Sequence, residues 1–253
     1  VWTGTGNGWA DDANWVDGNV PVAGDTVFVV GETDKITVGD DDIELASSLA
    51  KIQLNGAQSE LVIDVTEDAN LGCMVQGAGT IVKKGSGSVI LTSEVSDSGY
   101  NTTNGMRIEE GLLSLPQTTE QLLPRGDFTL TKVYVGENGV LGLHAAPDKT
   151  ANNIFTSLEG YGVVTCLTQK AGPYQLRVDG KEGKTFHGKI TGNVRIYSKG
   201  VFNLPMENWK STNPLWVNLL ISKAIRRFNP AVSAVFIVSG ILEKHHQLER
   251  MEK

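Results

Sequence analysis

The chain has 253 residues, of which 40% are hydrophobic and 20% charged, and its formal net charge is −7. This composition excludes an intrinsically disordered chain, which would combine low hydrophobicity with high charge. The acidic balance argues against nucleic acid as a partner, because nucleic-acid grooves concentrate Lys and Arg. No apolar run reaches the ~20 residues of a membrane-spanning helix, so we expect a folded protein without a transmembrane segment.

The N-terminal segment, residues 1–30, is rich in tryptophan. No charged and apolar signal sequence follows Val1, so we expect any export signal to have been removed or to lie outside this sequence. The segment contains Trp2, Trp9 and Trp15. We predict that these rings form an aromatic cap over the first part of the fold, with a sugar-stacking platform as the alternative.

The densest acidic run is "GDDDIE", residues 39–44. In an extended strand alternate residues share a face, so Asp40 and Asp42 could point together toward a cation. A solvated loop is the interpretation that we prefer, because no Lys or Arg at a matching position completes the site of a polysaccharide lyase.

Similar units recur along the middle of the chain, as in "MRIEEGLLSL" (106–115), "VYVGENGVLGL" (133–143) and "VRIYSKGVFNL" (194–204). Each contains a β-branched residue, a polar turn, a glycine, two apolar residues and a final leucine. The predicted turn positions are spaced by 24 to 33 residues and are Ser59, Gly87, Gly111, Gly139, Gly172 and Gly200. Repeats of this length with short alternating strands are typical of stacked coils.

The predicted fold is therefore all-β: a right-handed parallel β-helix of about six to seven coils over residues 1–207. The glycines would occupy corners, and branched aliphatic residues would fill the inner face. A β-sandwich is the alternative, favoured where turns recur every 8 to 12 residues. The β-helix predicts that Leu91, Leu115, Leu143 and Leu204 point into one column of the core. It also predicts that Cys73 and Cys166 lie several coils apart and form no disulfide.

Two motifs give the chain a resemblance to a known family. "GAGTIVKKGSGSVIL" (77–91) and "SGYNTTNGMRIEEGLLSL" (98–115) resemble the two halves of the autotransporter-associated β-strand repeat. "FHGKITGNVRI" (186–196) resembles another phrase of these repeats, and residues 2–29 resemble the segment that opens such regions. The matching residues are Gly79, Thr80, Lys83, Gly85, Gly87 and Leu91 in the first half and Asn101, Thr103, Gly111 and Leu115 in the second.

The resemblance implies a non-enzymatic, adhesin-like β-helical stalk that is secreted or lies at the cell surface, associated with the outer membrane in a larger precursor. Its partners would be glycans or components of a host or cell surface. A carbohydrate-active β-helix enzyme, either a polysaccharide lyase or a glycoside hydrolase, is one alternative. A carbohydrate-binding module is another. A groove with stacked carboxylates would favour the enzyme, and a flat aromatic strip would favour the module.

The composition changes at Asn208. Residues 208–253 contain seven Lys and Arg residues against three Glu, whereas the rest of the chain is acidic. Apolar residues at helical spacing in 215–228 and a helix-forming end at 243–253 predict a short α-helical tail. The tail could cap the last coil, lie on a membrane surface, or be a foreign end that packs poorly. We expect it to be dispensable for ligand binding and to matter for solubility.

The sequence contains no recognisable catalytic, metal or cofactor motif, and it predicts no particular binding residues. His144, His187, His245 and His246 are scattered, and the last two lie on different sides of any helix, so they form no zinc pair. Glu109 and Glu110, beside Arg107, are interpreted as an exposed corner. Asn101–Thr103 is a formal glycosylation sequon. The oligomeric state stays open.

Overall fold

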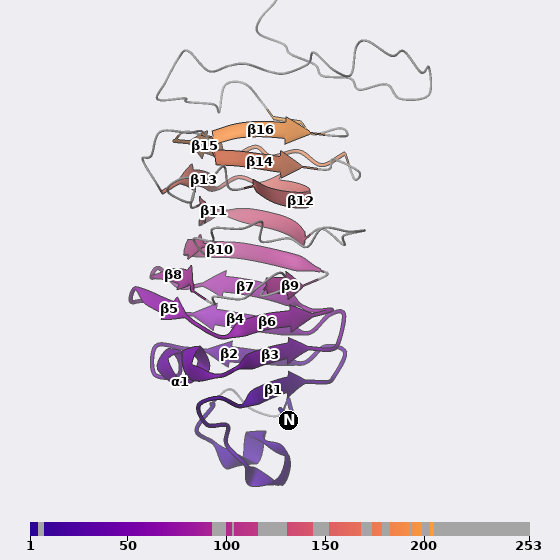
Figure 1. The fold of residues 1–253 in the computed structure, drawn as a ribbon, viewed down its shortest axis with the longest axis vertical. Coiled ribbons are helices and arrows are strands. Elements are labelled where there is room, and N and C mark those ends of the chain that lie inside the picture. Colours follow the sequence, from indigo (N-terminus) through magenta and orange to yellow (C-terminus); the bar gives the residue numbers. More distant parts are fainter. Residues whose placement is uncertain are drawn as a thin grey trace, which may run out of the picture.

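A computed structural model describes residues 1–4, 8–92, 100–102, 104–115, 131–143, 152–167, 174–178, 183–192, 194–198 and 203–204. They form a parallel β-solenoid of about five turns, stacked from the N-terminus at one end to β16 at the other (Figure 1). The expected all-β parallel solenoid is confirmed, whereas the expected number of six to seven coils is not. Two of the predicted turn glycines, Gly172 and Gly200, lie outside the described residues.

Two sheets run along the stack. The smaller contains β1 (Thr26–Val29), β3 (Lys51–Leu54), β6 (Met74–Gly77) and β9 (Tyr100–Thr102). The main path of the larger is β2 (Lys35–Val38), β4 (Glu60–Asp64), β7 (Thr80–Lys84), β10 (Gly105–Ser114), β11 (Thr131–Leu143), β12 (Asn152–Gly160), β14 (Tyr174–Val178) and β16 (Val194–Ser198). Beside this path lie β5 (Ala69–Leu71), β8 (Ser88–Leu91), β13 (Val163–Cys166) and β15 (Lys189–Thr191). The pairings between these strands are parallel, which contradicts a hairpin-rich β-sandwich.

Most strands are three to five residues long, as expected, but β10, β11 and β12 are longer. β10 and β11 each continue through a corner of the coil, so that one strand covers two sides. β11 has one residue more than β10 at this corner, where the register between them shifts after Ile108.

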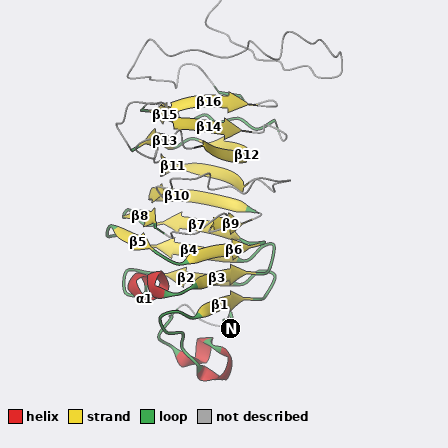
Figure 2. Cartoon of the chain, viewed as in Figure 1, coloured by secondary structure: helices red, strands yellow, loops and turns green. Residues whose placement is uncertain are grey.

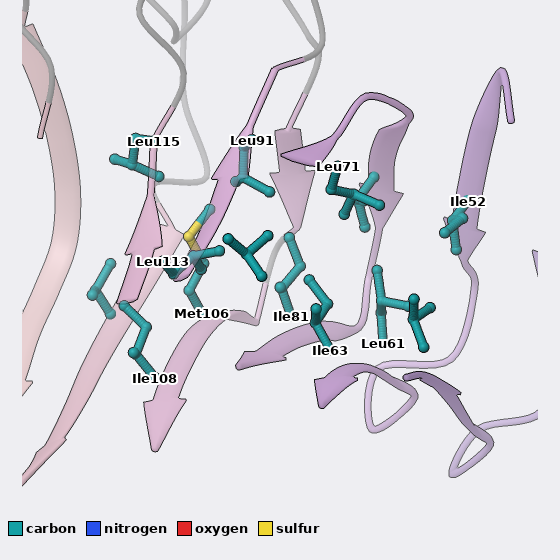
Figure 3. Close-up of a cluster of buried hydrophobic side chains, with 14 of the residues drawn as sticks. Ile52, Leu61, Ile63, Leu71, Ile81, Leu91, Met106, Ile108, Leu113 and Leu115 are labelled. Atoms are coloured by element: carbon teal, nitrogen blue, oxygen red, sulfur yellow. The ribbon is translucent and has the colours of Figure 1, made fainter. Parts of the chain in front are cut away.

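The core is a column of aliphatic side chains between the sheets (Figure 3). Leu71 pairs with Leu91 in register, and Ser114 pairs with Gly142, which brings Leu115 and Leu143 into line. Leu91, Leu115 and Leu143 are buried, so this part of the leucine prediction is confirmed.

The fourth leucine was assigned to the wrong column. Leu204 is half-buried and packs against the core. The bridge between Thr185 and Asn203 sets it beside Phe186, whereas Leu143 pairs with Cys166. The segment that ends at Leu204 resembles the other repeats in sequence, but its strand register relative to the core differs.

One corner of the solenoid is a column of glycines. Gly111 and Gly139 pair in register, and the pairing of adjacent residues extends the column to Gly87, Gly162 and Gly188. A Cβ on Gly111 would lie 2.5 Å from the carbonyl oxygen of Gly87, and one on Gly188 would lie 2.1 Å from that of Gly162. Coils approach too closely here for any side chain. The predicted position Ser59 belongs elsewhere, because it neighbours Gly79 in register.

Helices occur at the N-terminal end of the described chain (Figure 2). They are the 3₁₀ turns η1 (Asp12–Asn14) and η2 (Val16–Gly18) and the short helix α1 (Ile43–Ser48). α1 was not expected from the sequence; it replaces a strand in the first coil and packs beside β5. The predicted helical tail, residues 208–253, lies outside the described residues, and nothing in the structure supports it.

The three tryptophans form the predicted cap. Trp2, Trp9 and Trp15 are at most 3% exposed, and their rings pack at centroid distances of 5.2 and 5.5 Å. The indole nitrogens of Trp2 and Trp9 donate to the carbonyl oxygens of Lys35 and Thr37, at 3.1 and 2.6 Å. These bonds tie the N-terminal segment to β2. Because the rings are buried, they offer no sugar-stacking platform.

Candidate binding face

The outward side of the larger sheet is the candidate site, and we call it the outer face. Its central column is set by register and contains Thr37, Val62, Val82, Arg107, Tyr134 and Glu159. Most residues on either side of these members point inward and join the core, as Leu61 and Ile63 do around Val62. Side chains from distant parts of the sequence thus stand in line, ~4.8 Å apart.

Four ion pairs connect the N-terminal half of the outer face. Glu60 accepts from Lys35 at 2.9 Å and from Arg107 at 3.0 Å. Arg107 also donates to Glu109 at 2.7 Å, and Glu109 lies 3.6 Å from Lys84. We call these five residues the charged ladder. Arg107 and Glu109 are therefore part of a network across four strands, and the interpretation as a simple exposed corner is incomplete.

Glu60 is the central carboxylate of the charged ladder. Its side chain is only 14% exposed, and each of its two oxygens faces a different cation. Burial raises the pKa of Glu60, but the hydrogen bonds and charges of Lys35 and Arg107 outweigh burial, so the pKa lies below its ordinary value. Glu60 is thus ionised at neutral pH.

The charged ladder surrounds a small apolar strip. Val62 and Val82 share the outward column with Arg107, yet they are 7% and 0% exposed and lie outside the core cluster. The aliphatic stem of an arginine covers apolar surface while its guanidinium stays hydrated. Arg107 therefore has the reach and position to cover Val82, its direct neighbour in register.

The C-terminal half of the outer face carries aromatic side chains. Tyr134 is 39% exposed, and Tyr161 is 62% exposed. The rings of Tyr161 and His187 stack with centroids 5.0 Å apart and an interplanar angle of 12°. Nearby, Lys184 pairs with Glu159 at 3.3 Å. Since the two rings stack on each other from adjacent coils, they present edges and do not form a flat strip.

Lys83, one of the residues that carry the family resemblance, is fully buried. It points inward from β7, and its Nζ donates to the carbonyl oxygens of Lys84 and Gly85, the latter at 2.7 Å. Burial lowers the pKa of Lys83, and the charges of Asp64, Glu110 and Asp40 only partly oppose this. The ammonium group thus holds a corner of the coil together from within.

The acidic run does not form a cation site. The carboxylate of Asp40 accepts from the backbone nitrogen of Thr66 at 3.0 Å and from its hydroxyl at 2.8 Å, which ties one corner to the next coil. Asp42 instead precedes α1, and burial raises its pKa. Asp68 caps another corner by accepting from the backbone of Ser88 at 2.8 Å. These carboxylates serve the corners of the solenoid.

The other residues singled out in the sequence can be compared directly with the structure. Cys73 and Cys166 form no disulfide, as predicted, and burial raises the pKa of Cys73 to about 12. His144, His245, His246 and Thr103 lie outside the described residues, so the glycosylation sequon is only partly visible. Among the residues that the structure describes, no group of three His, Cys, Asp or Glu side chains could hold a metal ion. No helix in this described part is long and apolar enough to cross a membrane.

Comparisons with family models, with curated proteins and with solved structures gave no match.

Sequence reasoning missed the charged ladder. Its members become neighbours only when the register is known, because Glu60 and Arg107 are 47 residues apart. One sequence signal could have placed Lys35 beside Glu60. Lys35, Glu60 and Thr80 each begin a short strand rich in β-branched residues, and aligning these strands puts the three residues in one row.

Proposed function

We propose that this chain is a non-catalytic, adhesin-like β-solenoid of a secreted or cell-surface protein. Its role is to hold an outer face in a fixed, extended arrangement for a binding partner. The proposal is supported by the resemblance to autotransporter-associated repeats and by the coils stacked in register. A right-handed coil and an association with the outer membrane through a larger precursor belong to the same proposal.

One observation carries the non-catalytic part: Glu60, the most enclosed carboxylate of the charged ladder, is neutralised by two cations. A glycoside hydrolase needs one carboxylic acid with a raised pKa beside a second, ionised carboxylate. The pKa of Glu60 is lowered, and Glu109 on the other side of Arg107 is itself paired with two cations. This arrangement suits a rigid surface better than proton transfer.

A carbohydrate-active enzyme is the second candidate, and the raised pKa of Asp42 favours it. A carboxyl group whose pKa is raised by burial has one property of a general acid. Asp42 lies at the start of α1, away from the charged ladder. It therefore gives the enzyme hypothesis a specific residue to test.

Assays of polysaccharide cleavage test the proposal. The purified chain is incubated with neutral and uronate-containing polysaccharides, and new reducing ends and unsaturated products are measured. We expect no turnover, and equal background for the wild type, Asp42→Asn and Glu60→Gln. Turnover that disappears in Asp42→Asn or Glu60→Gln would overturn the non-catalytic proposal.

A further inference from the structure

A step in the length of the corner loops creates a groove at one edge of the outer face. Residues 30–34 join β1 to β2, and residues 55–59 join β3 to β4. In the next coils the corresponding connections shrink to residues 78–79 and 103–104. The two longer loops therefore stand out beside the recessed corner at residues 78–79, and we call the resulting hollow the ledge.

The ledge has a volume of about 500 Å³, and most of the residues that line it have polar side chains. Besides Ala57, it is lined by Thr33, Lys35, Gln58, Glu60, Thr80 and Asn104. Lys35, Glu60 and Thr80 are consecutive in register and form one wall. The other wall comes from the long loops, and Asn104 donates its side-chain amide to the carbonyl oxygen of Ala57 across the recessed corner.

The ledge is held in place by the backbone. The nitrogen of Gln58 donates to Glu32 at 3.0 Å, that of Glu60 to Asp34 at 2.9 Å, and that of Thr80 to Ser59 at 2.9 Å. The ion pairs of Glu60 fix the carboxylate in one orientation. A ligand would therefore meet a preformed surface, which lowers the entropy cost of binding.

The lining selects a class of ligand. Two hydroxyl groups, two amides and one ion pair offer both donors and acceptors, and saccharide hydroxyls also act as both. Polyanions are disfavoured by Glu60 and by the net charge of −7. Cations are disfavoured by Lys35 and Arg107.

We infer that the ledge binds a neutral saccharide, whose hydroxyl groups bond to Thr80, Gln58 and Asn104 while Lys35 and Glu60 provide charged hydrogen bonds. The spacing of ~4.8 Å between coils is close to the length of one pyranose ring, so an extended chain of sugars running along the solenoid would place successive rings on successive coils. The inference deepens the proposed function and rests on it, because it names a neutral saccharide as the binding partner of the outer face.

The test is a titration of the full chain with four probes: β-1,4-linked glucose and N-acetylglucosamine tetramers, an α-1,4-linked glucose tetramer, and tetragalacturonate. Calorimetry and ligand-observed NMR report binding. We expect at least one neutral tetramer to bind, and Thr80→Val and Gln58→Ala each to weaken it by about 3- to 10-fold, the value of one net hydrogen bond. Phe28→Ala is the control and should leave the affinity unchanged, because Phe28 is 38% exposed on the smaller sheet and does not line the ledge.

Three results would overturn the inference: no neutral tetramer binds, only tetragalacturonate binds, or both ledge variants keep the wild-type affinity. Circular dichroism and thermal melting establish that each variant is folded. Mass spectrometry of the recovered tetramer separates the two proposals. A cleaved tetramer contradicts the non-catalytic function, whereas an intact tetramer that fails to bind contradicts only the ledge.

Discussion

The two sides of β4, β7 and β10 follow different rules. Inward, Leu61, Ile81 and Met106 are in register, and all three are buried and apolar. Outward, Val62 and Val82 give way to Arg107. Apart from Lys83, the inward residues of these strands meet apolar neighbours in the coils above and below, so one chemistry repeats. The outer face has no such constraint, and its residues are matched instead to particular partners one or two coils away.

The largest expected effect comes from an inward leucine. Leu91→Ala removes a fully buried side chain from the core column and should lower the free energy of unfolding by about 2 to 5 kcal/mol. Its neighbour Ile90 is 39% exposed on the other side of β8, and Ile90→Ala should cost no more than about 0.5 kcal/mol. Denaturant titration of both variants measures this difference. Equal losses would show that the assignment of sides is wrong.

Two adjacent lysines sharpen the comparison. Lys83→Met leaves the carbonyl oxygens of Lys84 and Gly85 without their buried donor and should cost about 1 to 3 kcal/mol. Lys84 is 44% exposed, and its nearest carboxylate is 3.6 Å away, so Lys84→Met should cost less than about 1 kcal/mol. Chemical denaturation at neutral pH is the measurement. A more stable Lys83→Met variant would mean that the buried charge costs more than its hydrogen bonds return.

The charged ladder should contribute less than the core. Arg107 is about one-third exposed, so water screens its pairs, and Arg107→Met should cost about 1 kcal/mol or less. The loss should shrink at high salt, because salt screens partly exposed charges. Unfolding at low and high ionic strength tests this, and a loss that does not depend on salt would point to packing over Val82 as the main contribution of Arg107.

The smallest effect should come from the exposed corner carboxylates. A hydrogen bond from the Thr66 hydroxyl lowers the pKa of Asp40, and hydrogen bonds from Ser88 lower that of Asp68. Since the native state binds these protons less readily than the unfolded chain, the stabilisation is present above the unfolded value of about 3.9. It disappears as the pH falls through the lower folded pKa values.

Thermal melting between neutral and strongly acidic pH measures this loss. Asp40→Asn should be slightly less stable than the wild type at neutral pH, and the two should converge in acid. A gap that widens in acid would contradict the sign of the pKa shift.

The core could be predicted from the sequence because it repeats. The β-branched couplets, the leucines at 91, 115 and 143, and the glycines at 87, 111 and 139 recur at similar spacing, and each recurrence marks the same place in the coil. Gly162, which continues the glycine column from Gly139 to Gly188, was missed. It lies 23 residues after Gly139, whereas the predicted position Gly172 lies outside the described residues.

The ledge and the charged ladder could not be predicted from the sequence. They depend on which residues of different coils become neighbours, and a single change in loop length alters that. The shortening from residues 55–59 to residues 78–79 is invisible without strand boundaries. α1 was missed for a related reason, since six residues provide too little helical pattern to recognise.

Parallel, in-register stacking is the claim on which the core, the outer face and the ledge all depend. It is tested most directly by a disulfide between Tyr134→Cys and Glu159→Cys, which are paired in register, in a background with Cys73→Ser and Cys166→Ser. Their Cα atoms should lie ~4.8 Å apart, within the range of a disulfide, whereas Lys132→Cys with Glu159→Cys is offset by two residues and should exceed the limit of about 7 Å. Rapid oxidation of the first pair and little of the second is predicted; the reverse would contradict the register.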